Sequence, residues 1–318
     1  MVRKPASGFN RSPRARGGTE QSWCMARNIT PVLRFSKLQC DHRLANTLSY
    51  FEFGHLRFSN ITQLSAMASL RGKIIAITGS ASGIGLATTR RLAALGATIS
   101  MVDVNTDVLA NLHRELTAKY PGQKFLSKTV SVSDRSAVTS WIKETVHELG
   151  PLHGAANLAG IMGKDAYKVA TEHIDDTDWE RVMGVNLYGV LNCMREEIKN
   201  IRDGGSIVNA SSLAGLIGVP RHAAYVCSKH AVIGLSRTAA KELGPRGVRV
   251  NAVAPGPIAT PLMADAVARM GSGVTENTLA LGRAGEPEEV ASVVSFLLSD
   301  ESTFVTGSVQ VIDGGIAC

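Results

Sequence analysis

The feature that most constrains the fold is a glycine-rich loop between an apolar run and an amphipathic segment. Residues 73–78 (Lys-Ile-Ile-Ala-Ile-Thr) are short and β-branched, whereas residues 85–95 carry apolar side chains at helical spacing. The loop between them has the sequence Gly-Ser-Ala-Ser-Gly-Ile-Gly and ends at Gly85. A strand, a tight glycine turn and a helix in this order predict the phosphate-binding turn of a dinucleotide-binding βαβ unit.

Beyond Met67 the chain repeats this alternation of short apolar runs and longer amphipathic segments, which is typical of a parallel sheet. One helix is expected to begin near Thr106 and another to span 223–243. The predicted strands lie at 73–78, 98–102, 125–132, 154–157, 206–209, 249–253 and 308–312. We therefore predict an α/β fold in which residues 67–318 form one Rossmann-type domain, a single doubly wound parallel sheet of seven strands with helices on both faces.

Residues 1–66 differ in composition from this domain. They hold ten of the 34 Lys and Arg residues but only three of the 27 Asp and Glu residues, so the formal excess of +7 lies entirely there. This basic N-terminal extension is rich in Arg and Ser and poor in acid, a composition resembling a mitochondrial transit peptide. The alternatives are a disordered tail or an artefact of how the start of the gene was assigned, with Met67 as the true start. The domain is expected in the cytoplasm, or in mitochondria if the extension is a genuine transit peptide.

Composition also bears on partners. The basic extension could attract nucleic-acid phosphates, but no base-reading motif accompanies it, so no nucleic-acid partner is expected. No stretch reaches the roughly 18 to 20 consecutive apolar residues of a membrane span, so no membrane partner is expected. The five cysteines are scattered, with no CxxC pair and no histidine at ligand spacing, which indicates a reducing compartment and no metal site.

The glycine loop and the acid that follows it indicate the cofactor. Backbone amides at the loop and at the helix start are expected to hold a pyrophosphate, with contacts from Gly79, Ser82, Gly83, Ile84 and Gly85. Asp103 follows 18 residues after Gly85, where a carboxylate can accept hydrogen bonds from ribose hydroxyls and repel a 2′-phosphate. NAD is therefore expected over NADP, with NADP as the alternative. Asp103 could instead be a solvated carboxylate at a strand end.

Tyr225 and Lys229 stand four residues apart on the helix expected at 223–243, and so share one face. Tyr120 and Lys124 have the same spacing, but the Pro-Gly pair between them predicts a turn, so those side chains need not meet. The strand predicted at 206–209 ends close to Ser212, 13 residues before Tyr225. A hydroxyl, a phenol and an ammonium brought together in this way predict a device for proton transfer.

Through these motifs, residues 70–315 closely resemble the short-chain dehydrogenase/reductase family. The resemblance implies that Ser212 binds the substrate carbonyl and that Tyr225 is the catalytic acid/base. It implies that Lys229 and oxidised nicotinamide lower the pKa of the phenol, and that Asn186 holds a water linking Lys229 to solvent.

The resemblance also implies further cofactor contacts, from the motif after the fourth strand, from the loop after the sixth and from the catalytic pair. These residues are Asn157, Gly160, Tyr225, Lys229, Pro255, Gly256, Ile258 and Thr260, the last two holding the nicotinamide carboxamide. Ser131 stands where the family usually has an aspartate touching adenine, so adenine is expected to be held more loosely.

The segment between Pro261 and Glu286 is rich in Ala, Met, Gly and Leu and resembles the family's substrate lid. Such a lid favours a small, largely apolar alcohol or ketone, and the sequence is similar to members that process secondary metabolites. Two alternatives remain open: a non-catalytic cofactor-binding scaffold or sensor, and an epimerase or dehydratase using bound cofactor. The family also implies a homodimer or homotetramer.

Overall fold

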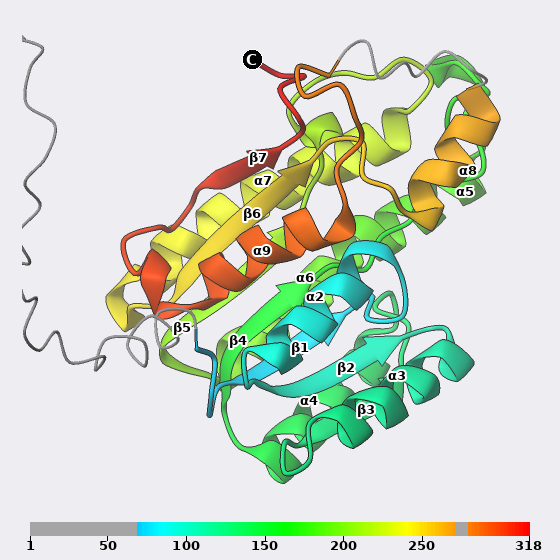
Figure 1. Cartoon of the computed structure of the whole chain (residues 1–318). Helices are drawn as coiled ribbons and strands as arrows, with labels where there is room; N and C mark the ends of the chain where they lie inside the picture. The colour runs from blue at the N-terminus through cyan, green and yellow to red at the C-terminus, as the bar shows by residue number, and fades with distance from the viewer. Residues whose placement is uncertain (1–68, 271–278) are drawn as a thin grey trace, which may run out of the picture. The chain divides into compact units, whose positions relative to one another are not determined.

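The computed structural model describes residues 69–270 and 279–318. The predictions for residues 1–66, and for the part of the lid at 271–278, lie outside the described residues. The described chain forms a seven-stranded parallel sheet with the order β3-β2-β1-β4-β5-β6-β7 (Figure 1), which confirms the predicted fold. The strands are β1 (Ile74–Thr78), β2 (Thr98–Asp103), β3 (Phe125–Thr129), β4 (Leu152–Asn157), β5 (Ile201–Ala210), β6 (Arg249–Pro255) and β7 (Val309–Ile312).

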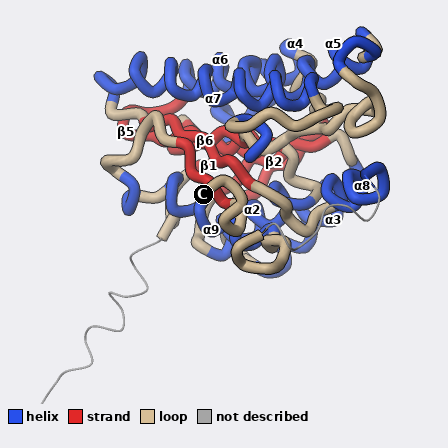
Figure 2. The backbone as a smooth tube through the Cα atoms, turned by 90° about the horizontal axis from the view of Figure 1, so that it is seen from above, coloured by secondary structure: helices blue, strands red, loops and turns tan. Residues whose placement is uncertain are grey.

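Helices cover both faces of the sheet (Figure 2). One layer contains α2 (Gly83–Ala94), α3 (Thr106–Lys119) and α9 (Pro287–Leu298). The opposite layer contains α4 (Arg135–Leu149), α6 (Gly189–Asn200) and α7 (Ala223–Leu243). Two shorter helices, α5 (Asp176–Met183) and α8 (Pro261–Met270), follow the carboxyl ends of β4 and β6. Because helices cover both faces, the central strands are buried on both sides and are mostly apolar, although they also carry buried polar side chains such as Asn209 and Asn251.

Each helix layer packs on the sheet through its own hydrophobic core. Leu92 and Leu116 are fully buried in the layer of α2, α3 and α9. Trp141 is the largest buried side chain of the other layer, and its indole N–H donates a 2.8 Å hydrogen bond to Ser100 Oγ. That bond satisfies the one polar atom of the indole, so Trp141 can be buried at little cost.

The bounds of α7 match the expected range, but the range 125–132 for the third strand is wrong at its end. β3 ends at Thr129, after which the chain turns toward Asp134, whose side chain caps α4. Val130 and Val132 are buried in the core under α4. Their apolar character therefore reflects core packing beyond the strand.

The strand order reverses between β1 and β4, since β2 and β3 lie on one side of β1 and β4 to β7 on the other. In open parallel sheets, ligands bind beyond the carboxyl ends of the strands at such a switch point. The fold therefore places the expected ligand site there. Over residues 69–270 and 279–318, no helix combines the length and apolar character that a membrane span requires.

Candidate active site

A groove of about 310 Å³ opens at this switch point. Its volume lies at the lower end of the roughly 300 to 1,000 Å³ typical of small-molecule sites. The carboxyl ends of β1, β2 and β4 and the loop after β6 form its walls. Among the sequence-predicted cofactor residues, those that line the groove are Gly79, Ser82, Gly83, Ile84, Gly85, Asp103, Gly160 and Thr260.

The turn between β1 and α2 depends on two glycines. At Gly85, a Cβ atom would lie 1.8 Å from the carbonyl oxygen of Gly79. Gly79 has a φ of +72°, and a Cβ atom there would lie 2.9 Å from the backbone of Ala159. Side chains at either position would force the turn apart, so the glycines are required by close packing of the loop as well as by its conformation.

The N-terminus of α2 presents backbone amides to the groove. The first amides of a helix have no acceptor within the helix, and the side chain of Ser82, at the N-cap position, makes no capping hydrogen bond. The first turn of α2 contains no acidic residue. Free amides and the positive end of a helix dipole attract phosphate groups. The residues present therefore fit a dinucleotide pyrophosphate.

Asp103 ends β2 at the rim of the groove. Its Oδ2 atom accepts a 2.9 Å hydrogen bond from the Ala81 amide, and its Oδ1 atom accepts one of 3.0 Å from the Asn105 amide. These bonds fix the carboxylate and tie the glycine loop to β2. Each carboxylate oxygen retains a lone pair for a ligand hydroxyl, so holding the loop and binding a ribose are compatible.

The loop after β6 crosses toward the glycine turn. A Cβ atom at Gly83 would lie 3.0 Å from the methyl group of Thr260, so the two loops are in close contact. The Thr260 hydroxyl donates a 3.1 Å hydrogen bond to the carbonyl oxygen of the buried Ile258. Pro255 and Gly256 lie at the end of β6, where the Gly256 amide hydrogen bonds to β7. This arrangement brings the predicted nicotinamide-side residues next to the pyrophosphate turn.

Asn157 does not line the groove. It is 1% exposed, and its Nδ2 atom donates hydrogen bonds of 3.0 Å to Glu197 Oε2 and 2.9 Å to Asn209 Oδ1. Both amide protons are therefore used within the protein. The side chain therefore joins β4, β5 and α6, and the expected contact of Asn157 with the cofactor stays a prediction.

Tyr225 and Lys229 lie one turn apart in α7. Lys229 Nζ lies 5.5 Å from the centre of the Tyr225 ring and donates a 2.8 Å hydrogen bond to the carbonyl oxygen of Ala210. The lysine is 3% exposed, and this burial lowers its pKa to about 8. Gly160 leaves room for the ammonium, since a Cβ atom there would lie 3.3 Å from Nζ.

Burial dominates the acid–base state of Tyr225. It raises the pKa of the phenol to about 12, while the nearby Ser212 hydroxyl acts in the opposite direction. Desolvation of the phenol is the largest cause of this shift. The expectation that Lys229 and oxidised nicotinamide together lower the pKa applies to the complex with cofactor and stays a prediction. At neutral pH Tyr225 is thus a protonated phenol.

Ser212 follows β5 and caps the short helix η3 (Leu213–Gly215), accepting a 3.2 Å hydrogen bond from the Ala214 amide. Its hydroxyl donates to the carbonyl oxygen of Pro255 at 3.4 Å, which is long for an O–H donor. A hydroxyl held so weakly can turn toward a ligand oxygen. Ser212, Tyr225 and Lys229 therefore converge where β5 and β6 end, as the sequence predicts.

Asn186 lies in a π-helical turn, η2 (Gly184–Tyr188), between α5 and α6. Its Nδ2 atom donates to the Ile161 carbonyl at 2.9 Å and to Ser228 Oγ at 3.1 Å, and its Oδ1 atom accepts from the Ile161 amide at 2.8 Å. Both Nδ2 protons are thus used within the protein, whereas Oδ1 keeps a second lone pair. The expected water link to Lys229 stays a prediction, and π-helical turns are frequent at functional sites.

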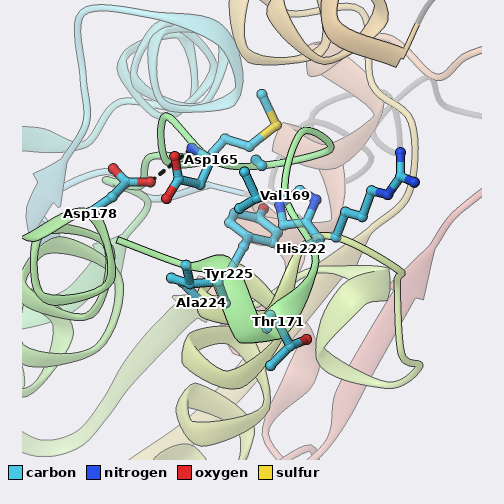
Figure 3. Close-up of a pocket in the computed structure, with 12 residues that line it drawn as sticks. Asp165, Val169, Thr171, Asp178, His222, Ala224 and Tyr225 are labelled. Carbon is cyan, nitrogen blue, oxygen red and sulfur yellow. Dashed lines mark hydrogen bonds between the residues drawn. The ribbon is translucent and has the colours of Figure 1, made fainter. Parts of the chain in front are cut away.

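Sequence reasoning missed His222, which immediately precedes α7. Its ring lies 4.6 Å from the Tyr225 ring and 4.4 Å from the Tyr167 ring, measured between centroids. Figure 3 shows His222 beside Tyr225 in a second, narrow pocket. In the sequence, only its position three residues before Tyr225 could have drawn attention to this histidine. Its burial results from tertiary contacts with the loop after β4, which the sequence does not reveal.

Fold and site together define a dinucleotide-dependent oxidoreductase of the Rossmann type. The family model described as enoyl-(acyl carrier protein) reductase matches residues 79–317. The short-chain dehydrogenase/reductase ABA4 of Pyricularia oryzae is 45% identical over 248 residues, covering 77% of this chain and 92% of the relative. Cyclohexanol dehydrogenase of an Acinetobacter species is 39% identical over 244 residues, covering 76% of this chain and 94% of the relative. The chain belongs to the short-chain dehydrogenase/reductase family.

Solved structures agree with this assignment. Levodione reductase superposes with a TM-score of 0.73 at 35% identity, covering 77% of this chain and 97% of that structure. A blue fluorescent protein from a metagenomic library, in complex with NADPH, superposes with a TM-score of 0.71 at 33% identity, covering 79% of this chain and 100% of that structure. The family uses NAD or NADP, and the likeness alone does not select between them.

Proposed function

We propose that this protein interconverts a small, largely apolar secondary alcohol and its ketone with a nicotinamide cofactor, using Tyr225 as the acid/base. The observation that carries the proposal is the convergence of Ser212, Tyr225 and Lys229 beside a groove whose glycine turn fits a pyrophosphate. A scaffold or sensor would have no need of a phenol and an ammonium buried together at this point.

The chemistry of the site follows from these side chains. A bound nicotinamide supplies or accepts the hydride at the reacting carbon. In the reductive direction, Ser212 donates a hydrogen bond to the ketone oxygen, and Tyr225 gives that oxygen its proton as negative charge develops. In the oxidative direction, the proton of the alcohol passes to the phenolate oxygen of Tyr225. The charge of Lys229 stabilises that phenolate.

We propose NAD as the preferred cofactor because of the charge at the groove rim. Asp103 is held at the rim by two backbone amides, and its carboxylate repels a 2′-phosphate. Among the described residues that line the groove, none is Lys, Arg or His. A 2′-phosphate would therefore meet a negative charge with no cation to offset it.

The substrate class is proposed from the apolar walls and from the relatives. Met162, Ala166 and Ala266 pack together where α8 meets the loop after β4, next to the site. One relative is named for cyclohexanol, which is a carbocyclic secondary alcohol. We therefore expect an alicyclic secondary alcohol or ketone, and secondary metabolism is a natural source of such compounds.

Self-association is also part of the proposal. Phe304 is completely exposed, and Phe296 of α9 and Val311 of β7 are 38% and 46% exposed. We infer that these exposed apolar side chains are covered by a second copy. A homodimer or homotetramer is expected, and light scattering after size exclusion measures the mass directly.

The test is turnover by the purified full-length chain with NAD or NADP and a panel of cyclohexanol, the cyclohexanediols and the matching ketones. We expect turnover that the substitution Tyr225→Phe lowers by at least about a hundredfold, while NADH still raises the melting temperature of the variant. Retained turnover in the variant would refute the role of Tyr225. Product formed without net change in NADH would instead assign an epimerisation or dehydration.

A further inference from the structure

The narrow pocket beside Tyr225 contains a buried histidine without hydrogen-bond partners. His222 is 5% exposed, and neither its Nδ1 nor its Nε2 atom has a partner in the described part of the protein. Buried polar atoms in native proteins are nearly always hydrogen bonded, and each exception calls for an explanation. A ligand that reaches the pocket would supply the missing partner.

His222 does not serve the helix that it precedes. It occupies the N-cap position of α7, yet its side chain makes no capping hydrogen bond. Serine, threonine, aspartate and asparagine are preferred at this position because they do make one. The imidazole instead packs edge-on against Tyr167 and tilted against Tyr225.

Two residues beside the His222 ring have uncommon backbone conformations. Arg221 and Tyr167 have φ values of +58° and +65°, which residues other than glycine rarely adopt. The two residues are tied together, since the Tyr167 amide donates a 2.7 Å hydrogen bond to the Arg221 carbonyl. Strained residues of this kind concentrate at functional sites, where the surrounding structure enforces them.

The two carboxylates of the pocket already have partners. Asp178 accepts hydrogen bonds from two backbone amides and pairs with Arg181, and Asp165 accepts one from the Asp175 amide. Burial lowers the pKa of His222 to about 4, so the ring is neutral and offers one donor and one acceptor. The free volume of the pocket is about 10 Å³, which suits a group the size of one water molecule.

We propose that His222 binds a second oxygen of the substrate, a hydroxyl or keto group separated by a few bonds from the carbon that reacts at Tyr225. The inference rests on the proposed function and narrows its substrate class to neutral, dioxygenated alicyclic compounds. A neutral imidazole recognises such an oxygen by a hydrogen bond and gives no ion pair to a carboxylate. Tyr225 therefore binds the reacting oxygen, and His222 selects compounds that carry another.

The test compares cyclohexanol with the 1,2-, 1,3- and 1,4-cyclohexanediols in the full-length enzyme. We expect at least one diol to exceed cyclohexanol about tenfold in kcat/KM. His222→Phe keeps a ring but removes both nitrogens, and should bring that ratio to about one. His222→Gln restores one hydrogen-bonding group and should recover part of the ratio. His173→Phe, an exposed histidine outside the pocket, is the matched control and should leave the ratio unchanged.

Two outcomes would overturn the inference. In one, His222→Phe leaves the ratio between diol and cyclohexanol as it was. In the other, it lowers kcat equally for every substrate, which would indicate a part in proton transfer. Binding measurements distinguish a failure of this inference from a failure of the proposed function. Tyr225→Phe loaded with NADH does not turn over, so the dissociation constants of cyclohexanol and of the diols can be compared in that variant with and without His222→Phe. This comparison tests His222 even if no alcohol is oxidised.

Discussion

Lys229 Nζ lies 5.5 Å from the centre of the Tyr225 ring but donates its short hydrogen bond, of 2.8 Å, to the carbonyl oxygen of Ala210. The ammonium is thus anchored to the end of β5 and acts on the phenol through its charge. Because Tyr225 is buried and its pKa is raised to about 12, that charge matters most when the phenol must lose its proton. The two directions of the reaction should therefore depend differently on Lys229.

Replacing Lys229 with methionine tests this dependence. Lys229→Met removes the charge that favours phenolate, so kcat/KM for alcohol oxidation at neutral pH should fall by about a hundredfold. Ketone reduction uses the protonated phenol and should fall less. Steady-state rates in both directions measure the difference. Lys241→Met, at an exposed position of the same helix, is the control and should change neither rate.

The pH dependence of the two directions follows from the same raised pKa. Below that pKa, each unit of pH increases the phenolate fraction about tenfold, so log kcat/KM for oxidation should rise with a slope of about one from neutral pH, and less steeply above about pH 8, where Lys229 loses its charge. Reduction needs the protonated phenol, so its rate should be flat near neutrality and fall only in alkaline solution. Oxidation that is independent of pH between 7 and 9 would contradict the assignment of Tyr225 as the base.

Local patterns in the sequence predict much of this site. The bounds of α7 and the spacing of Tyr225 and Lys229 follow from helical periodicity, and the turn at Gly85 follows from its neighbours along the chain. The convergence of Ser212 with that pair follows from the rule that parallel strands end at one edge of the sheet. These features depend on contacts that are close in sequence or fixed by topology.

What the sequence does not predict depends on burial between distant segments. The amide of Asn157 is used by Glu197 and Asn209, and no local pattern indicates that network. The raised pKa of Tyr225 results from desolvation, which spacing along a helix cannot reveal. His222 likewise becomes notable only because the loop that carries Tyr167 folds over it.

Cofactor choice can be tested by reversing the charge at the groove rim. Asp103→Asn combined with Val104→Arg keeps a hydrogen-bond acceptor for the glycine loop and places a cation at a position that is 68% exposed. The ratio of kcat/KM for NADP to that for NAD should rise by at least about tenfold, because repulsion of the 2′-phosphate becomes attraction.

A matched pair of substitutions separates local charge from net charge. Asp107→Asn with Val108→Arg makes the same change in the first turn of α3, at exposed residues that do not line the groove. This control should leave the cofactor ratio unchanged. An equal shift of the cofactor ratio in both double variants would mean that Asp103 does not contribute to discrimination at the ribose.

The buried carboxyl of Glu197 makes stability depend on pH. The residue is fully buried beside Cys193, its Oε1 atom has no partner among the described residues, and burial raises its pKa to about 8 from an ordinary 4.5. The folded protein therefore holds a proton that the unfolded chain releases above pH 4.5. Its contribution to stability is complete below pH 4.5, declines as pH rises and is lost above about pH 8.

Glu197→Gln should remove this dependence. The amide stays neutral and keeps an oxygen to accept the hydrogen bond from Asn157, so the free energy of unfolding should no longer fall between pH 5 and 8. The wild-type loss over that range is at most about 4 kcal/mol, at about 1.4 kcal/mol per pH unit. Urea titrations at several pH values measure it, with Glu148→Gln, an exposed carboxyl, as control. Parallel pH profiles for wild type and Glu197→Gln would show that Glu197 is ionised in the folded state and that hydration or a rearranged network stabilises its charge.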